Sequence, residues 1–240
     1  SSFSKDFSKL QGLEPSLVDQ SEDSYEVENI TVQDQQYLEI KEAKGGITFI
    51  KSPKGTGKTE FLKNHVRSFT QRYQTFEEYE EDTYDEDKPI YHKDRRVLLI
   101  GHRQSLIGEL CNRIGLNSYL EDSNYKEQEV LVRKNRYGVC LDSLWKVSKD
   151  QYDLVIIDEV EQVLSHFLSG TIGSKRFSIF EIFSRLIRES KQTIVLDSDI
   201  SWVSFNTLTS LIRESDEDTE LRSNFIQVNL FKKKDQTIRI

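Results

Sequence analysis

The residues with the clearest chemical signature form the stretch SPKGTGKT, from Ser52 to Thr59. It follows the apolar run ITFIK and precedes helix-forming sequence, which is the context that a phosphate-binding loop requires. Glycines let such a loop curl so that its amides point at phosphate oxygens, and the following helix N-terminus favours the same anion. We therefore predict a nucleotide-binding loop that consists of Pro53, Lys54, Gly55, Thr56, Gly57, Lys58 and Thr59.

The catalytic groups that such a loop needs are also present. Lys58 would reach the β- and γ-phosphates, and Thr59 would offer its hydroxyl to Mg²⁺. Asp158 follows the apolar run LVII, so at the carboxyl end of a parallel strand it would face the loop and hold the metal. Glu159 stands one residue further, where a general base could polarise the attacking water. The sequence thus predicts ATP and Mg²⁺ as ligands, with Lys58, Asp158 and Glu159 as catalytic residues.

Two further polar segments follow apolar runs. The first, GHRQSL, places His102, Arg103 and Ser105 where they could hold backbone phosphates of a nucleic acid, although an exposed helix cap would read the same way. The second, LDSDIS, places Asp197 and Asp199 where nucleotide hydrolysis could be sensed, and here the simpler alternative is a helix N-cap.

The elements that must position these residues are recognised by their apolar patterns. Several runs are continuously apolar rather than alternating, which is typical of parallel strands covered on both faces. Amphipathic stretches separate them, so we expect an α/β fold with a mostly parallel sheet flanked by helices. The expected strands are 46–51, 97–101, 139–141, 153–158 and 193–197, and the expected helices are 58–73, 104–114, 159–168 and 179–190.

The flanking segments have a different character. Residues 1–40 are polar and are predicted to be an N-terminal extension, with a helix at about 32–43. Residues 41–222 would form the main lobe, and 223–240 would be two short strands that begin a connection to another lobe. The chain has no methionine and opens on Ser1, so we expect it to be a piece of a longer protein.

Composition and charge limit the setting. The net charge of −8 comes from residues 76–87, an insert with eight acids; without them the acidic residues number 33, as many as Lys and Arg. This run is expected to be a solvated loop, and the acidity is no argument against nucleic acid. No apolar run approaches the roughly 18 residues of a membrane span. Cys111 and Cys140 lack metal spacing, which favours buried free thiols and a cytoplasmic location.

Taken in order, five segments resemble the motifs of superfamily 2 helicases: SPKGTGKT, IGHRQSL, GVCLDSLWKV, IIDEVEQVLSHFLSGT and VLDSDIS. The likeness is greatest to the origin-binding helicase of herpesviruses and to the helicase region of cyanobacterial plasmid replication proteins. It covers about residues 37–231. The resemblance implies a RecA-like P-loop lobe of a two-lobed motor, which uses ATP to move on single-stranded or forked DNA in replication, with a primase region or other replication proteins as partners.

The resemblance also assigns roles to residues. Arg103 and Ser105 fall in one strand-contacting motif, and Ser143 lies near another. Asp197 and Asp199 match the motif that links hydrolysis to unwinding, and Glu161 would bridge to it. Two positions depart from the family pattern, with Ser52 in place of Gly or Ala, and Asp-Ser-Asp in place of Ser-Ala-Thr.

The second lobe of such a motor, with its arginine finger, has no counterpart in these 240 residues. Because an arginine finger contributes on the order of 10³ to 10⁵ in rate, this chain alone should bind ATP weakly and hydrolyse it slowly or not at all, whereas the full protein would be an ATPase. Two alternatives stay open. One is another P-loop ATPase, such as an AAA+ loader or a transporter ATPase; the other is a non-catalytic lobe that binds nucleic acid or a partner and whose nucleotide site is vestigial.

Overall fold

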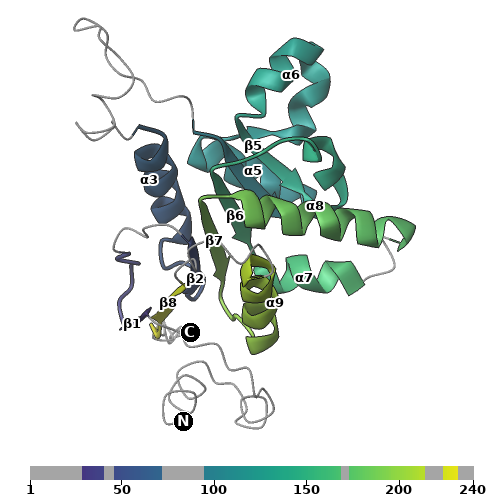
Figure 1. Ribbon diagram of the computed structural model, residues 1–240. Coiled ribbons are helices and arrows are strands. Elements are labelled where there is room, and N and C mark those ends of the chain that lie inside the picture. The colour runs from purple at the N-terminus through teal and green to yellow at the C-terminus, as the bar shows by residue number, and fades with distance from the viewer. Residues whose placement is uncertain (1–28, 41–45, 72–94, 169–172, 214–223, 232–240) are drawn as a thin grey trace, which may run out of the picture.

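The computed structural model describes residues 29–40, 46–71, 95–168, 173–213 and 224–231. The strands in these ranges form one parallel sheet, in the order β1-β8-β2-β7-β6-β3-β5-β4 (Figure 1). The α/β class with a parallel sheet is therefore confirmed. The strands are β1 (Asn29–Gln33), β2 (Gly46–Lys51), β3 (Val97–Gly101), β4 (Asn117–Ser118), β5 (Arg136–Cys140), β6 (Leu154–Asp158), β7 (Gln192–Asp197) and β8 (Asn224–Asn229).

Helices cover both faces of the sheet. The α-helices are α3 (Lys58–Gln71), α5 (Gln104–Ile114), α6 (Glu127–Arg133), α7 (Val160–Leu168), α8 (Arg176–Glu189) and α9 (Trp202–Arg213), with 3-10 turns η1 (Tyr119–Asn124), η2 (Leu141–Val147) and η3 (Gly173–Lys175). Helices α3 and α5 pack together on one face, and α7, α8 and α9 pack on the other (Figure 1). No helix in these ranges is long and apolar enough to cross a membrane.

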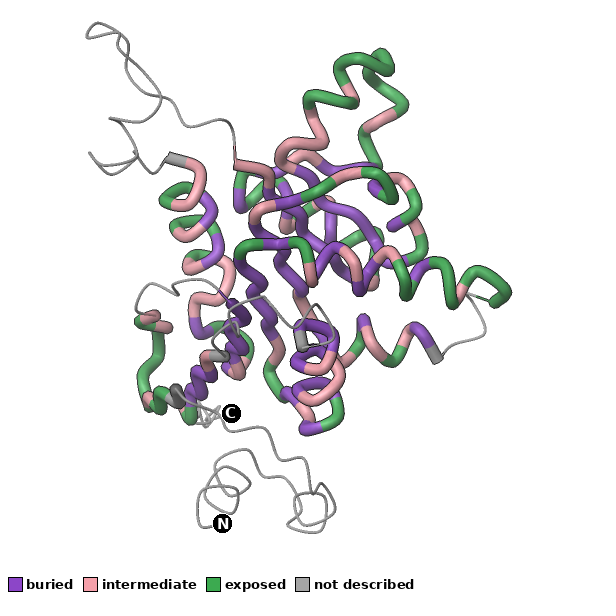
Figure 2. Tube along the Cα trace, in the orientation of Figure 1, coloured by how far each residue is buried: buried purple, intermediate pink, exposed green. Residues whose placement is uncertain are grey.

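The core lies along the middle strands of the sheet. Every residue of β3 is buried, and so are the first four of β6. Figure 2 shows this burial concentrated on the strands, whereas α6 is largely exposed. Both cysteines are free and buried, as predicted, and burial raises the pKa of Cys111 to about 12. The middle strands are continuously apolar because helices cover both faces of the sheet, so side chains on either face of a strand are buried.

Two expectations about the flanks are wrong. Residues 32–40 contain no helix; Val32 belongs to β1. The strand expected at the start of 223–240 is present at 224–229, but as β8 it lies inside the sheet between β1 and β2 and so belongs to the lobe itself. The remaining parts of these segments, together with the acidic insert 76–87, lie outside the described residues.

Buried amide side chains explain why a polar sequence such as β8 can lie inside the sheet. Gln227 Nε2 donates to Gln33 Oε1 at 3.0 Å and to the Glu39 carbonyl at 2.8 Å. Asn229 Nδ2 donates to the Gln35 carbonyl at 2.9 Å. Because these groups find partners on β1 and the segment after it, their burial does not leave hydrogen bonds unmade.

The sheet order brings the chemically marked segments to one edge. The carboxyl ends of β2, β7, β6 and β3 are consecutive in the sheet, and all four strands run parallel. They lead into the predicted phosphate loop, Asp197, the Asp158–Glu159 pair and His102, respectively. In open α/β sheets ligands bind at this edge.

Candidate functional site

The predicted phosphate loop after β2 is held closed by buried hydroxyl groups. Gly55 and Gly57 have φ angles of 79° and 83°, in the left-handed region that favours glycine. The hydroxyls of Ser52 and Thr56 are 2.6 Å apart, and Thr56 Oγ1 donates to the Pro53 carbonyl at 2.7 Å. The Ser52 hydroxyl, where the family pattern has Gly or Ala, therefore has a structural role, since it fastens the start of the loop to Thr56.

The ammonium group of Lys58 is folded back into the loop. Its Nζ donates to the carbonyl of Ser52 at 2.5 Å and to that of Pro53 at 2.8 Å. Burial lowers the pKa of Lys58, and the negative charges of Asp158 and Asp197 oppose this shift. The lysine and the carboxylates of β6 and β7 thus share one electrostatic environment, which is what a site for nucleotide phosphates and a cation requires.

The predicted metal ligand Asp158 ends β6 and is largely buried. Burial raises the pKa of its carboxyl group to about 6, and the neighbouring charge of Glu159 adds to the shift. A carboxylate whose ionised form is disfavoured in this way would gain from a bound cation, and Mg²⁺ prefers oxygen ligands and keeps several waters. Within the described residues no group of three His, Cys, Asp or Glu side chains could hold a metal ion. Asp158 and Thr59 therefore fit Mg²⁺ together with a nucleotide, but they do not form a complete protein site.

Glu159 has an unusual backbone conformation. Its φ is 52°, the one positive φ outside glycine among the described residues. Its carbonyl accepts hydrogen bonds from the amides of Gln162 and Val163, so Glu159 starts α7. Left-handed conformations of non-glycine residues are costly and cluster at functional sites. The structure thus holds Glu159 under strain at the position predicted for the general base.

The side chain of His102 points at Glu159. His102 Nδ1 lies 3.2 Å from Glu159 Oε2, and the two side chains are 11% and 35% exposed. Burial lowers the pKa of His102, which favours the neutral form of the ring, and the negative charge of Glu159 opposes this shift. The sequence placed His102 among the nucleic-acid contacts, but the structure places its ring against the predicted general base.

The segment after β7 is tied to α7. The amide of Glu161 donates to Asp197 Oδ2 at 3.0 Å, and Glu161 Oε1 accepts from the Ser201 amide at 2.7 Å. Asp199 forms an ion pair with Lys51 Nζ, at 2.7 Å, across to the end of β2. The three predicted coupling residues therefore connect the ends of β7, β6 and β2.

The predicted nucleic-acid contacts lie at the ends of the two adjacent strands β3 and β5. Arg103 and Ser105 are exposed at the start of α5, and the Arg103 side chain makes no cap bond there. Ser143 is half-buried in η2, beside Asp142, whose carboxylate bonds His166 Nε2 at 2.8 Å. Since β3 pairs with β5, these residues line one stretch of the same sheet edge.

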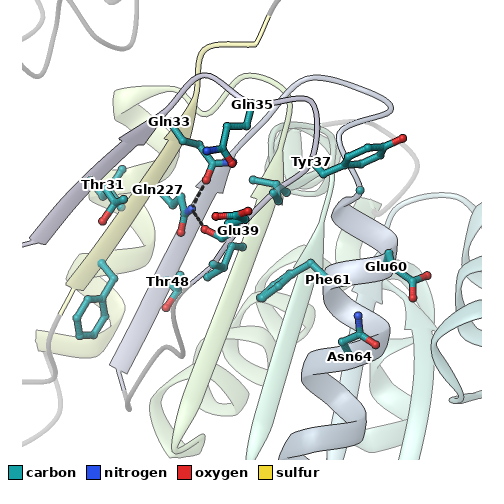
Figure 3. A pocket seen from close by; sticks show the side chains of 15 residues that line it. Thr31, Gln33, Gln35, Tyr37, Glu39, Thr48, Glu60, Phe61, Asn64 and Gln227 are labelled. Atoms are coloured by element: carbon teal, nitrogen blue, oxygen red, sulfur yellow. Dashed lines mark hydrogen bonds between the residues drawn. The ribbon is translucent and has the colours of Figure 1, made fainter.

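Sequence reasoning missed an open pocket beside the phosphate loop. Figure 3 shows this pocket, of about 950 Å³, between β1, β8 and α3. Its wall includes Tyr37, which is 64% exposed, and Gly57, where an added Cβ would lie 3.6 Å from the Tyr37 ring. The Leu38 amide donates to the Thr56 carbonyl at 2.9 Å and so fixes this segment to the loop. No spacing in the sequence relates Tyr37 to Gly57. The helix wrongly expected at 32–43 also gave no reason to place Tyr37 beside the loop.

Comparison with known proteins gives a consistent group. A family model described as "Origin of replication binding protein" matches residues 87–237. A protein of Acanthamoeba polyphaga mimivirus, named "Uncharacterized putative helicase R8", is 32% identical over 78% of this chain and 16% of its own length. An uncharacterized protein of the cyanobacterium Picosynechococcus is 30% identical over 75% of this chain and 17% of its own. The "Replication origin-binding protein" of Psittacid herpesvirus 1 is 25% identical over 68% of this chain and 17% of its own. The chain thus spans about one sixth of the length of these relatives.

Proposed function

This chain belongs to the origin of replication binding protein family, and from that premise we propose that it is the ATP-binding lobe of an ATP-dependent DNA helicase or translocase acting in replication. The similarity to herpesvirus and cyanobacterial proteins, predicted from the motifs, is confirmed. The observation that carries the proposal is that the predicted phosphate loop and Asp158 lie at one sheet edge. There the negative charge of Asp158 opposes the lowering of the Lys58 pKa by burial.

The chain's own groups suffice to bind and orient a triphosphate. Lys58 would exchange the carbonyls of Ser52 and Pro53 for phosphate oxygens, and the loop amides would supply the remaining hydrogen bonds. Thr59 and Asp158 would hold Mg²⁺, which supplies neutralisation of charge on the β- and γ-phosphates. Glu159 would accept the proton of the attacking water. In this arrangement ATP binding and ATP hydrolysis depend on different residues.

The pocket beside Tyr37 is the place for the nucleotide base. It opens next to Gly57, so a phosphate chain held by the loop can continue into it. A flat aromatic ring such as that of Tyr37 can stack on a purine, and the amides of Gln35 and Asn64 are available for hydrogen bonds to its edge. The assignment of this pocket to the base depends on the proposal that the loop binds a nucleotide, and it would be wrong if no nucleotide binds.

DNA would contact the edge formed by Arg103, Ser105 and Ser143. Hydroxyl groups, arginine and free amides at a helix start are the groups that hold backbone phosphates without reading sequence. Such contacts suit movement along a strand, because they repeat at each nucleotide. The alternative functions, a vestigial nucleotide lobe or another P-loop ATPase, would not require these residues to act together with Glu159.

The test is ATP hydrolysis by the intact natural protein, with and without single-stranded DNA, for wild type, Glu159→Gln and a matched control, Glu109→Gln. Glu109 is an exposed glutamate on α5. We expect DNA-stimulated hydrolysis in wild type and control, and a loss of at least about 100-fold in Glu159→Gln with ATP binding retained. A wild type that binds DNA but neither binds nor hydrolyses ATP would establish the vestigial alternative.

A further inference from the structure

The contact between His102 and Glu159 joins two predicted functions in one pair of side chains. His102 follows β3 directly and precedes Arg103, the predicted DNA contact, whereas Glu159 follows β6 directly. The two strands are neighbours in the sheet, with Ile100 paired to Ile157, so the residues that follow them are held side by side. The 3.2 Å contact of the two side chains is therefore built into the sheet register.

The carboxylate of Glu159 is turned toward β3 rather than toward the phosphate loop. In the strand order β2-β7-β6-β3, His102 follows the strand that lies on the far side of β6 from the loop, and Glu159 Oε2 lies 3.2 Å from its ring. The backbone of Glu159 is fixed, because its carbonyl holds the first turn of α7. The direction of its side chain is thus set by His102 rather than by its main chain.

His102 is held on one side only. Its Nε2 is buried and has no hydrogen-bond partner among the described residues. The space next to the ring is very small, about the volume of one water molecule, and is lined by Gly101, Arg103, Leu106 and the acidic pair. The contact with Glu159 is therefore the polar contact that the structure gives the ring, and moving the ring would expose Nε2 to a new partner.

A strand of DNA has a direct means to move this ring. Arg103 and Ser105 are exposed and lie at the N-terminus of α5, where a phosphate would draw the segment toward itself. Gly101 packs so closely on Ile107 that an added Cβ would collide with the Ile107 side chain, so the segment and the first turn of α5 must shift together. His102 lies between these two anchors and cannot stay in place while they move.

We propose that His102 is a positioning residue that holds Glu159 away from the nucleotide until DNA binds at Arg103 and Ser105. The inference rests on the proposed function, in which Glu159 is the general base. Engagement of DNA shifts His102, the contact with Glu159 is lost, and the carboxylate turns toward the phosphate loop. ATP hydrolysis is thereby limited to the DNA-bound protein, with no need for His102 to touch ATP.

The experiment compares wild type, His102→Ala and His102→Asn in the intact natural protein, with kcat and KM for ATP measured without DNA and with saturating oligothymidylate. His102→Ala should raise the DNA-free kcat by roughly three- to tenfold, the effect of one lost polar contact, and leave the DNA-stimulated kcat and both KM values unchanged. His102→Asn keeps a donor near the place of Nδ1, so it should restore the low DNA-free rate.

Three results would count against this inference. Equal lowering of both rates in His102→Ala, with an unchanged ratio, would make His102 a structural residue. Loss of stimulation together with weaker DNA binding, measured by fluorescence anisotropy, and an unchanged DNA-free rate would make it a DNA contact. An absence of DNA-stimulated hydrolysis in wild type would instead overturn the proposed function, and the inference with it.

Discussion

The side chain of Asp197 accepts a hydrogen bond from the backbone amide of Glu161 at 3.0 Å, which ties the end of β7 to the start of α7. The Glu161 carboxylate forms a second link between the same two segments, because it accepts a hydrogen bond from the Ser201 amide at 2.7 Å. The segment that follows β7 is thereby fastened to the element that carries Glu159. A shift of the segment after β7 is therefore expected to move the start of α7, and a shift of α7 to move that segment.

Replacement of Glu161 tests this fastening. Glu161→Ala leaves the Ser201 amide without its acceptor, so we expect the free energy of unfolding to fall by about 1–2 kcal/mol in urea denaturation. Glu161→Gln keeps an acceptor oxygen and should lose less than half of that amount. In the intact protein we also expect Glu161→Ala to unwind fewer base pairs per ATP hydrolysed. Equal stability of all three proteins would show that the bond contributes nothing.

Lys58 should decide nucleotide affinity. Loss of its ammonium group removes charge-assisted hydrogen bonds to phosphate, so Lys58→Ala should raise the Kd for Mg²⁺ and a non-hydrolysable ATP analogue by at least about tenfold in calorimetry. Lys63→Ala is the matched control, since Lys63 lies on the same helix, is exposed and points to Glu60. If both variants bind as wild type does, the loop does not hold the triphosphate.

The Tyr37 pocket makes a different prediction, because it concerns the base and not the phosphates. Tyr37→Ala should weaken ATP binding by about 1–2 kcal/mol through lost stacking and should leave the affinity for inorganic triphosphate unchanged. Tyr125→Ala, at an exposed tyrosine far from the loop in sequence, serves as control. An equal loss of affinity for both ligands would mean that Tyr37 supports the loop rather than the base.

The raised pKa of Asp158 gives a pH dependence of stability. The folded pKa is about 6 and the ordinary value is 3.8, so between these two values the unfolded chain loses its proton first. In buffer without divalent cations, wild type should therefore lose stability relative to Asp158→Asn as the pH rises from about 4 to about 6, and the difference should then stay constant. Urea midpoints across this range measure it. A difference that grows with acidification would contradict the sign.

Close packing under α5 predicts a large contrast between two glycines. An added Cβ at Gly138 would overlap the Cys111 sulfur, whereas at Gly108 it would meet only Leu120 Cδ1 at an ordinary 3.6 Å. Gly138→Ala should cost about 1–3 kcal/mol or more through overpacking. Gly108→Ala, inside a helix, should be neutral or stabilising by up to about 1 kcal/mol. Denaturation of the two variants side by side tests this.

The central elements could be predicted because their signals are local. The apolar run LVII before Asp158 and the run ITFIK before Ser52 each mark a buried strand, and the structure confirms both to within one residue at each end. The motif of the predicted phosphate loop is also a run of consecutive residues. These features depend on neighbours in the chain, so a single sequence contains them.

The features that escaped prediction depend on contacts between distant segments. β1 pairs with β8, with Asn29 opposite Phe225, and no local pattern announces such a pairing. The place of β8 inside the sheet could not be predicted, because the partners of its buried Gln227 and Asn229, on Gln33 and Gln35, lie near the other end of the chain. The contact of His102 with Glu159 could not be predicted from the sequence either, since it requires β3 and β6 to be neighbours in the sheet.

The pairing of β1 with β8 also has a mechanical consequence. The chain leaves β8 at Leu230, whose amide bonds the Gln33 carbonyl, and β1 leads into the segment that places Tyr37 over Gly57. Because the two strands are parallel, a pull along β8 loads all their hydrogen bonds together, in shear, and does not peel them apart one by one. Tension applied beyond Phe231 would therefore pass through β1 to the wall of the Tyr37 pocket.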